Sequence, residues 1–382
     1  MEHNGIATTP IRCKAAVCKV AGEPLEMEEV EVAPPRAHEV RIKVVCTSLC
    51  HTDITFWRMK DRPSMFPLVL GHEAVGVVES VGEHVEEVGV GDTVVPVFLA
   101  QCGECADCRS PRSNLCSALP NRPGMPRDGT TRFSLAATGE PVHNFLSISS
   151  FAEYTVVDVA HVVRLAGDAL PPEKACLLSC GVATVEPGST VAIFGLGAVG
   201  LAVAQGSKMR GATRIIGVDL NPDKFEIGRK MGITDFVNPN DIGGQQTVSE
   251  AIKDMTGGNG ADYCFECIGL VSVMAEAFKS SRMGWGKTVV LGVDGSAAPI
   301  SIPSFDILKG RSVIGSHLGG IKPKDDIPVL AQKCLDKELE LDEFITHRVG
   351  FDEINRAFDL LAKGKCLRCI IWMDDGAKGN GA

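Results

Sequence analysis

The stretch TVAIFGLGAVG (Thr190–Gly200) constrains the fold of this chain most strongly, because it joins a buried strand to a glycine-rich turn and then to a helix. Its glycines, Gly195, Gly197 and Gly200, follow the G-x-G-x-x-G pattern, and residues 198–209 are predicted to be helical. The first glycine permits a tight turn, the second lets the backbone approach a pyrophosphate, and the third lets the helix pack on the strand. The pattern alone is weak evidence, but its place between a strand and a helix predicts a Rossmann dinucleotide-binding domain.

A carboxylate ends the next predicted strand, RIIGVDL. Asp219 lies 19 residues after Gly200, where a carboxylate binds the ribose hydroxyls of adenosine and repels a 2′-phosphate. The sequence therefore favours NAD over NADP. Lys224 is a candidate to hold the same ribose, although a solvated charge on a helix explains this residue equally well.

The order of the predicted elements divides the chain into two domains. After Ser189, the strands TVAIFG, RIIGVDL, YCFECIG and TVVLGV alternate with helical segments, which implies parallel βαβ units. Before about residue 165, the runs EVRIKVV, AVGVVESVG and DTVVPVF predict a partly antiparallel β domain. Residues after about 325 mix helix and strand and are predicted to return to that domain. We therefore expect an α/β protein with a β-rich domain (1–184 and 325–382) and a domain built on a doubly wound parallel sheet (185–324).

Composition excludes several function classes. A net charge of −10 argues against a nucleic-acid partner, because phosphate binding needs a concentrated basic surface. No apolar run reaches the ~18 residues of a membrane span, and the start MEHNGIATTP lacks a secretory signal pattern, so we expect a cytoplasmic protein without a membrane partner. In such a chain, fifteen cysteines favour metal binding over a disulfide scaffold.

Four of the cysteines lie in one short segment, QCGECADCRSPRSNLC. Their spacing, C-x2-C-x2-C-x7-C, lets four thiolates converge on one ion from tight turns, as in a closed structural zinc site. An iron–sulfur cluster also uses four cysteines and is the alternative, and four unrelated free thiols fit this spacing poorly. The residues are Cys102, Cys105, Cys108 and Cys116.

A second set of metal ligands is spread along the chain. Cys50 in SLCHTD, His72 in LGHEAVG and Cys180 in LLSCGVAT supply two thiolates and one imidazole, which leaves a fourth position open, as in a catalytic zinc site. Each residue alone is more simply explained by packing in the core. Their occurrence together with the four-cysteine segment and the glycine-rich turn favours a metal site. Glu73 is a candidate to tune the ion or to bind it directly. Thr52 is a candidate to accept the proton of a bound alcohol, or else to cap a local turn.

These motifs together resemble those of the zinc-dependent medium-chain alcohol dehydrogenases, and among them the plant members. The likeness runs from about Lys14 to Met373 and is carried by SLCHTD, GHEAVG, the four-cysteine segment, SCGVAT, STVAIFGLGAVGLA, IIGVDLNPDKF and ELELDEFITHRV. The resemblance implies a GroES-like catalytic domain, a Rossmann domain, two zinc ions per chain, NAD, an alcohol or aldehyde substrate, and a homodimer formed through the Rossmann sheets. It further implies that His51 and Arg368 face the cofactor pyrophosphate. By the same resemblance, the residues near the cofactor are Thr184, Val199 and Val293, and the residues that line the substrate pocket are Phe98, Phe145 and Leu146.

The sequence departs from the family pattern at two places. Thr55 stands where many members have a histidine that ends a proton relay. Between SCGVAT and the first Rossmann strand, roughly ten residues of the family's connector are missing, equivalent to about 15 Å of helix. An extended chain over residues 181–189 spans up to about 30 Å, so closure is feasible. Three hypotheses stay open: an active alcohol dehydrogenase, an impaired or inactive homologue, and a reductase of specialised plant aldehydes.

Overall fold

The chain forms two compact units in a computed structural model that describes residues 8–119, 124–167, 170–179, 186–244 and 246–374. The first unit combines residues 1–179 with 322–382, and the second spans residues 180–321. The boundaries expected from the sequence, after residues 184 and 324, fall five and three residues beyond these divisions.

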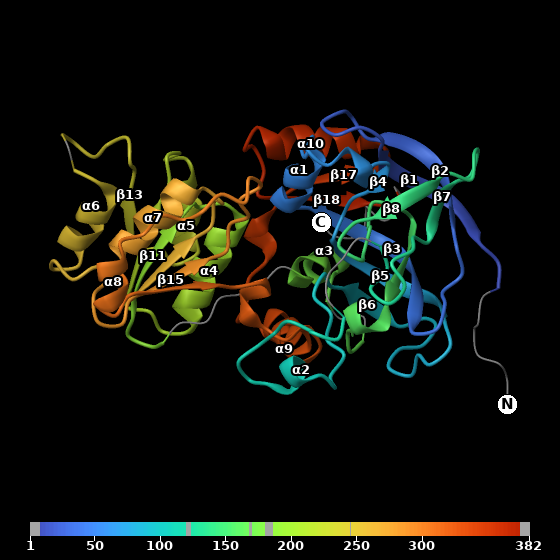
Figure 1. Cartoon of the computed structure of the whole chain (residues 1–382), viewed down its shortest axis with the longest axis horizontal. Helices are drawn as coiled ribbons and strands as arrows, with labels where there is room; N and C mark the ends of the chain where they lie inside the picture. The colour runs from blue at the N-terminus through green and yellow to red at the C-terminus, as the bar shows by residue number, and fades with distance from the viewer. Residues whose placement is uncertain (1–7, 120–123, 168–169, 180–185, 245, 375–382) are drawn as a thin grey trace. The chain divides into compact units, whose positions relative to one another are not determined.

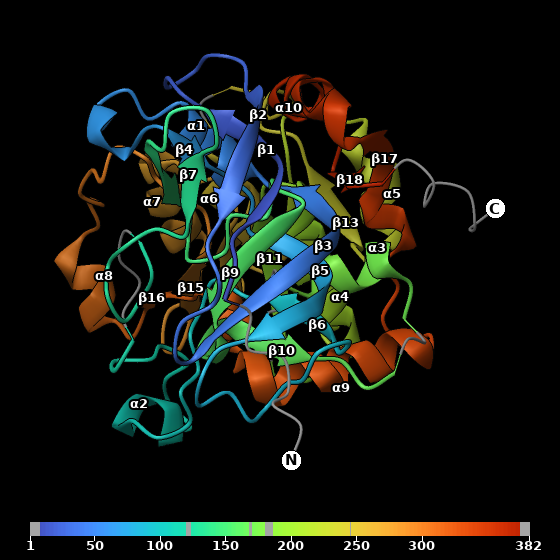
Figure 2. The same ribbon diagram turned by 90° about the vertical axis from the view of Figure 1, so that its right-hand side faces the viewer.

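The first unit is built from two antiparallel-rich β systems, as the alternating runs of the sequence predict (Figure 2). A small closed barrel contains, in spatial order, β1 (Ile11–Cys18), β2 (Glu26–Val32), β7 (Phe133–Leu135), β8 (Pro141–Asn144) and β4 (Leu68–Val69). A seven-stranded sheet follows the order β10 (Val162–Arg164), β6 (Thr93–Pro96), β5 (Glu73–Val81), β3 (Glu39–Leu49), β18 (Arg368–Trp372) and β17 (Ile345–Gly350), with β9 (Tyr154–Asp158) also paired to β3.

The C-terminal part of the chain returns to this first unit, because β18 pairs with the end of β3 and places Cys369 opposite Leu49. The helix α9 (Pro323–Leu335) comes before the strands β17 and β18 in the chain. The helix α10 (Ile354–Ala362) lies between these two strands in the chain and packs against β18. The remaining helices of the unit are short: α1 (His51–Trp57), α2 (Ala106–Arg109) and α3 (Pro172–Ala175), the last continued by the 3-10 turn η3 (Cys176–Ser179).

The second unit is a six-stranded parallel sheet with flanking helices, and it confirms the predicted α/β class (Figure 1). The strand order is β13 (Asp235–Val237), β12 (Arg214–Val218), β11 (Thr190–Phe194), β14 (Tyr263–Glu266), β15 (Lys287–Val290) and β16 (Ser312–Gly315). The helices are α4 (Ala198–Met209), α5 (Lys224–Lys230), α6 (Val248–Met255), α7 (Val271–Ser280) and α8 (Ser304–Leu308). The order reverses between β11 and β14, the position at which doubly wound sheets bind ligands.

The predicted elements of this unit match the structure closely where the hydrophobic pattern is strong. The helix predicted for residues 198–209 is α4 with the same bounds. Over the described ranges, no helix combines the length and the apolar character that crossing a bilayer requires.

Candidate functional site

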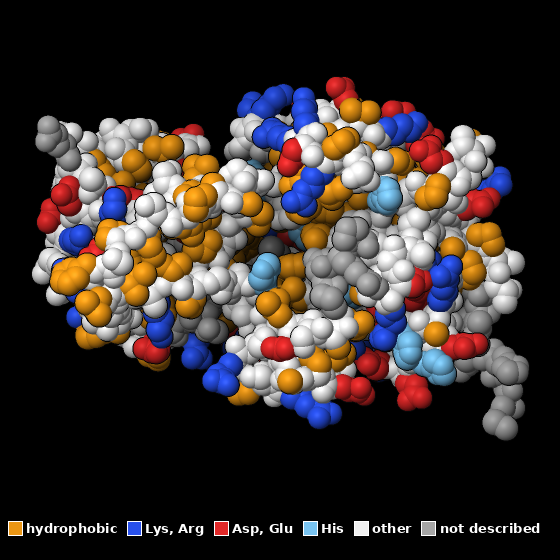
Figure 3. Space-filling model, viewed as in Figure 1, with side chains coloured by type: hydrophobic (Ala, Val, Ile, Leu, Met, Phe, Trp, Pro, Cys, Tyr) orange, Lys and Arg blue, Asp and Glu red, His pale blue; other side chains and the backbone are white. Residues whose placement is uncertain are grey.

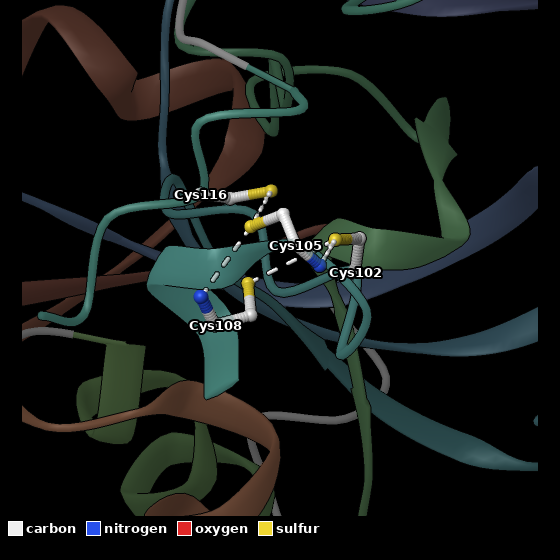
Figure 4. A group of neighbouring side chains, drawn as sticks. All are labelled: Cys102, Cys105, Cys108 and Cys116. Atoms are coloured by element: carbon white, nitrogen blue, oxygen red, sulfur yellow. Dashed lines mark hydrogen bonds between the residues drawn. The ribbon is translucent and has the colours of Figure 1, made fainter. Parts of the chain in front are cut away.

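The four clustered cysteines converge around the short helix α2 (Figure 4). All four Sγ atoms lie within 4.8 Å of one another, with Cys102 and Cys108 at 3.9 Å and Cys105 and Cys116 at 4.0 Å. A Zn–S bond of about 2.3 Å sets the corners of a tetrahedron about 3.8 Å apart. The spacing therefore fits one tetrahedral ion with no open position, better than a cluster of several irons.

The loop that carries these cysteines is tied to the start of α9. The Nζ of Lys322 donates to the backbone carbonyl of Cys108. The Gln101 amide donates to Asp325 at 3.0 Å and accepts from the backbone N–H of Lys324 at 2.8 Å. These bonds hold the loop in place independently of a metal, so the thiolates do not have to be gathered by the ion alone.

The second candidate metal cluster consists of Cys50, His72 and Glu73, which are buried and whose ligand atoms lie within 4.8 Å of one another. Cys50 follows β3 and His72 precedes β5, and the antiparallel pairing of Ser48 with Glu73 brings these ends together. Gly71 adopts a φ of +92°, and a Cβ there would lie 2.5 Å from the Oγ of Ser150. This backbone conformation, which only glycine takes without strain, directs His72 toward Cys50.

Asp53 holds both metal-binding segments and was not predicted from the sequence. Its carboxylate accepts from the backbone N–H of Cys50 at 2.9 Å and of Gly71 at 3.1 Å. It also lies 3.1 Å from Nδ1 of His72 and is fully buried. Because a carboxylate accepts, Nδ1 carries the proton and Nε2 is left to bind a metal. Its position three residues after Cys50, at the start of α1, was the only signal in the sequence.

The charges of this cluster shift the pKa values of its members. Burial alone lowers the pKa of His72, but the Asp53 carboxylate and the Cys50 thiolate raise it well above its ordinary value. Burial raises the pKa of Glu73 to about 7, although the Arg368 guanidinium acts in the opposite direction. A dication at this place would replace the protons that these groups otherwise hold, so the donor set fits a zinc ion.

Arg368, the first residue of β18, lies at the metal cluster. Its guanidinium forms a buried ion pair with the Glu73 carboxylate at 3.0 Å and lies 3.7 Å from Sγ of Cys50. The sequence predicted that Arg368 faces the cofactor pyrophosphate, and the contact with Glu73 was not foreseen. The pair links the negative charge near the metal ligands to a cation predicted to bind phosphate.

Two of the predicted substrate-side residues pack against His72. Its ring packs edge-on against Phe98 and Phe145, with centroids 6.0 and 5.8 Å away. Thr52 places its hydroxyl 3.8 Å from Sγ of Cys50. Leu146 follows Phe145 with a φ of +49°. The predicted third ligand, Cys180, and the predicted cofactor residue Thr184 lie outside the described residues.

In the second unit, the glycine-rich turn has the properties that each glycine predicts. At Gly200 a Cβ would lie 1.9 Å from the backbone oxygen of Gly195, so the helix packs too closely for any side chain. At Gly197 a Cβ would meet no described atom within 4 Å, which leaves open the space that a pyrophosphate needs. Gly195 itself has a φ of +95°.

The turn is fixed by Asp219, which directly follows β12. Its Oδ2 accepts from the backbone N–H of Leu196 at 2.7 Å and from Nζ of Lys224 at 2.9 Å. The predicted carboxylate and lysine are therefore neighbours in space. The other predicted cofactor residues in the described chain are Val199 in the first turn of α4, Val293 after β15, whose side chain is 53% exposed, and His51, exposed at the start of α1 in the first unit.

Family models match both units of the chain. The alcohol dehydrogenase GroES-like domain matches residues 36–167, and the zinc-binding dehydrogenase domain matches residues 198–336. Among solved structures, an alcohol dehydrogenase zinc-binding domain protein from Burkholderia ambifaria superposes with a TM-score of 0.86 at 32% identity, covering 96% of this chain and all of that one. The benzyl alcohol dehydrogenase of Acinetobacter calcoaceticus gives a TM-score of 0.82 at 28% identity, covering 95% of this chain and all of its own.

Plant proteins are similar to this chain over nearly its whole length. Alcohol dehydrogenase-like 2 of Arabidopsis thaliana is 57% identical over 383 residues, which cover 96% of this chain and 97% of that protein. Alcohol dehydrogenase 1 of Solanum tuberosum is 50% identical over 378 residues, covering 96% and 98%.

Proposed function

We propose that this chain interconverts an alcohol and its aldehyde or ketone, using NAD and two zinc ions per chain. The premise is its family: the chain belongs to the zinc-dependent medium-chain alcohol dehydrogenases of plant type and is an oxidoreductase acting on alcohols. The observation that carries the proposal is the buried set of Cys50, His72 and Glu73, with the Thr52 hydroxyl and two phenylalanine rings against it.

In this proposal, a bound zinc ion supplies the Lewis acid that lowers the pKa of an alcohol hydroxyl, and NAD supplies the hydride acceptor. Cys50 and His72 hold the metal, and Asp53 keeps the His72 ring in the tautomer that binds it. Thr52 relays the alcohol proton, because its hydroxyl accepts that proton while releasing its own to solvent. The rings of Phe98 and Phe145 exclude water from the reacting carbon. We assign the third ligand to Cys180, which lies outside the described residues.

NAD is the proposed cofactor because Asp219 directly follows β12 and lies beside the glycine-rich turn. A carboxylate at this place binds ribose hydroxyls and repels the 2′-phosphate of NADP. Lys224, within 2.9 Å of Asp219, supports the same ribose. Arg368 and His51 are also proposed to bind the pyrophosphate.

The four-cysteine loop is proposed to hold the structural zinc.

The free edge of β16 is proposed to form a homodimer. In the strand order of the described sheet, β16 is the last strand. Apolar side chains gather over α8 (Figure 3), and this helix and β16 leave exposed Phe305, Ile307, Leu308, Val313 and Ile314. Exposed apolar area beside an unpaired strand edge is typical of a self-associating surface.

The test is turnover by purified protein with a panel of primary and secondary alcohols and NAD, followed by NADH absorbance, and with aldehydes and NADH in reverse. Alcohol-dependent NADH formation supports the proposal, and a strong excess of the reverse rate favours an aldehyde reductase. The shortened connector after SCGVAT motivates the second candidate, an inactive homologue, which no turnover in either direction would support.

A further inference from the structure

Glu266, the last residue of β14, is a fully buried carboxylate at the carboxyl edge of the parallel sheet. Its Oε1 accepts from three successive backbone N–H groups, those of Ile268 at 2.9 Å, Gly269 at 2.8 Å and Leu270 at 3.4 Å. Burial raises the pKa of the Glu266 carboxyl above its ordinary value, and the backbone N–H groups around it act in the opposite direction. A buried carboxylate is costly unless it is hydrogen-bonded, so the side chain and this loop depend on one another.

The main chain of the same residue binds a second loop. The backbone carbonyl of Glu266 accepts from the N–H of Leu291 at 2.9 Å and of Gly292 at 3.0 Å, the residues that directly follow β15. Glu266 therefore holds the loop after β14 with its side chain and the loop after β15 with its carbonyl.

These two loops are in close contact. Gly269 has a φ of +88°, and a Cβ there would lie 2.4 Å from the backbone oxygen of Val293. At Gly292 a Cβ would lie 2.1 Å from the backbone nitrogen of Gly269 and 2.6 Å from Oε2 of Glu266. The backbones of the two loops therefore approach each other too closely for a side chain at Gly269 or Gly292.

The glycine-rich turn joins the same contact. A Cβ at Gly195 would lie 2.5 Å from the side chain of Ile268, the first residue whose N–H binds Glu266. The loops that follow β11, β14 and β15 thus meet at the edge of the sheet where a dinucleotide binds in this class of fold.

Oε2 of Glu266 is buried and has no hydrogen-bond partner in the described part of the chain. An apolar residue would avoid this unsatisfied oxygen but would leave three N–H groups without an acceptor. Local costs of this kind concentrate at functional sites, where they fix a conformation that a ligand needs.

We propose that Glu266 is a positioning residue for NAD, which presets the loops 267–270 and 291–293 in the conformation that receives the cofactor. The assignment rests on the proposed function, because it assumes that NAD binds at this edge. A preset loop loses less conformational freedom on binding, so Glu266 increases cofactor affinity without touching the reacting atoms.

The test compares Glu266→Ala and the isosteric Glu266→Gln with the wild type, using NADH fluorescence titration and amide hydrogen exchange of the cofactor-free protein. Asp262→Asn is the matched control, because Asp262 precedes the same strand at its opposite end and accepts from the backbone N–H of Thr190 at 2.9 Å. This control weakens a comparable backbone contact far from the carboxyl edge.

We expect Glu266→Ala to raise the Kd for NADH about tenfold, because the released loop must then be ordered on binding, and Glu266→Gln to retain part of the affinity because its amide oxygen still accepts. Amides 268–270 should exchange faster in both variants, and Asp262→Asn should leave the Kd and this exchange unchanged. Wild-type affinity in both Glu266 variants, or an equal loss in Asp262→Asn, would overturn the assignment alone. A wild-type chain that does not bind NADH would overturn the proposed function and the assignment with it.

Discussion

The carboxylate of Asp53 lies 3.1 Å from Nδ1 of His72, and the same carboxylate binds the backbone N–H groups of Cys50 and Gly71. One buried side chain therefore orients two proposed metal ligands, one that follows β3 and one that precedes β5. Partners of this kind fix the ring orientation of a ligating histidine and raise its basicity.

Asp53→Asn should lower the affinity of the Cys50–His72 site for zinc by about 10- to 100-fold, because the amide no longer supplies a negative acceptor to the His72 ring. Zinc retained per chain during titration with a chelator measures this loss. Asp61→Asn, an exposed carboxylate shortly after α1, is the control and should retain zinc as the wild type does. Equal retention by Asp53→Asn and the wild type would contradict the role given to Asp53.

Gly71→Ala should destabilise the first unit by about 2–3 kcal/mol, because the new methyl group combines an unfavourable φ of +92° with a 2.5 Å approach to Ser150. Gly139→Ala is the matched control, since its φ is +73° but its Cβ would meet no described atom within 4 Å. Denaturant unfolding of both variants separates the clash from the backbone strain. Equal destabilisation would show that Gly71 is not sterically required.

Asp219→Asn should raise the KM for NAD about tenfold and reduce the preference for NAD over NADP, because the carboxylate that repels a 2′-phosphate is removed. Steady-state kinetics with both cofactors measure the change. Asp223→Asn is exposed, lies four residues later, and should behave as the wild type. An unchanged preference in Asp219→Asn would remove the basis for choosing NAD.

The ion pair of Asp235 with Arg214, at 2.8 Å, should make the stability of the second unit depend on pH. The Arg214 guanidinium lowers the pKa of Asp235 below its ordinary value of 3.8. The stability it contributes is therefore complete above that unfolded value and is lost as the pH falls through 3.8 toward the folded pKa. Because the pair is partly exposed, the contribution is about 1 kcal/mol or less.

Asp235→Asn should accordingly be less stable than the wild type at pH 7, and the difference should narrow at pH 3.5. Thermal unfolding at the two pH values measures it, and Asp241→Asn, an exposed neighbour in the chain, should show no difference at either. A stability difference between Asp235→Asn and the wild type that increased from pH 7 to pH 3.5 would contradict the predicted contribution of this ion pair.

The features that the sequence predicted best are local. The β11–turn–α4 unit and Asp219 at the end of β12 follow from hydrophobic pattern and glycine chemistry within about 30 residues. The four cysteines are also local, because three short spacings determine that their thiols converge.

The features that were missed depend on contacts between distant segments. The Arg368–Glu73 pair exists because β18 joins the sheet beside β3, and nothing in the sequence near either residue indicates that pairing. Asp53 was missed because a carboxylate at a helix start is usually a cap, and its contact with His72 appears only when β3 and β5 are paired. Glu266 was missed because its partners are backbone N–H groups, which every residue type except proline supplies, so no sequence motif marks the contact.

Elemental analysis of zinc per chain in the monodisperse, purified protein tests the account most directly, because it counts both proposed sites in the intact chain. The account predicts two zinc ions: one in the four-cysteine loop and one held by Cys50 and His72 with the proposed ligand Cys180. One zinc ion per chain would contradict it, because the four-cysteine loop alone would be filled and the shortened connector would have separated the catalytic ligands.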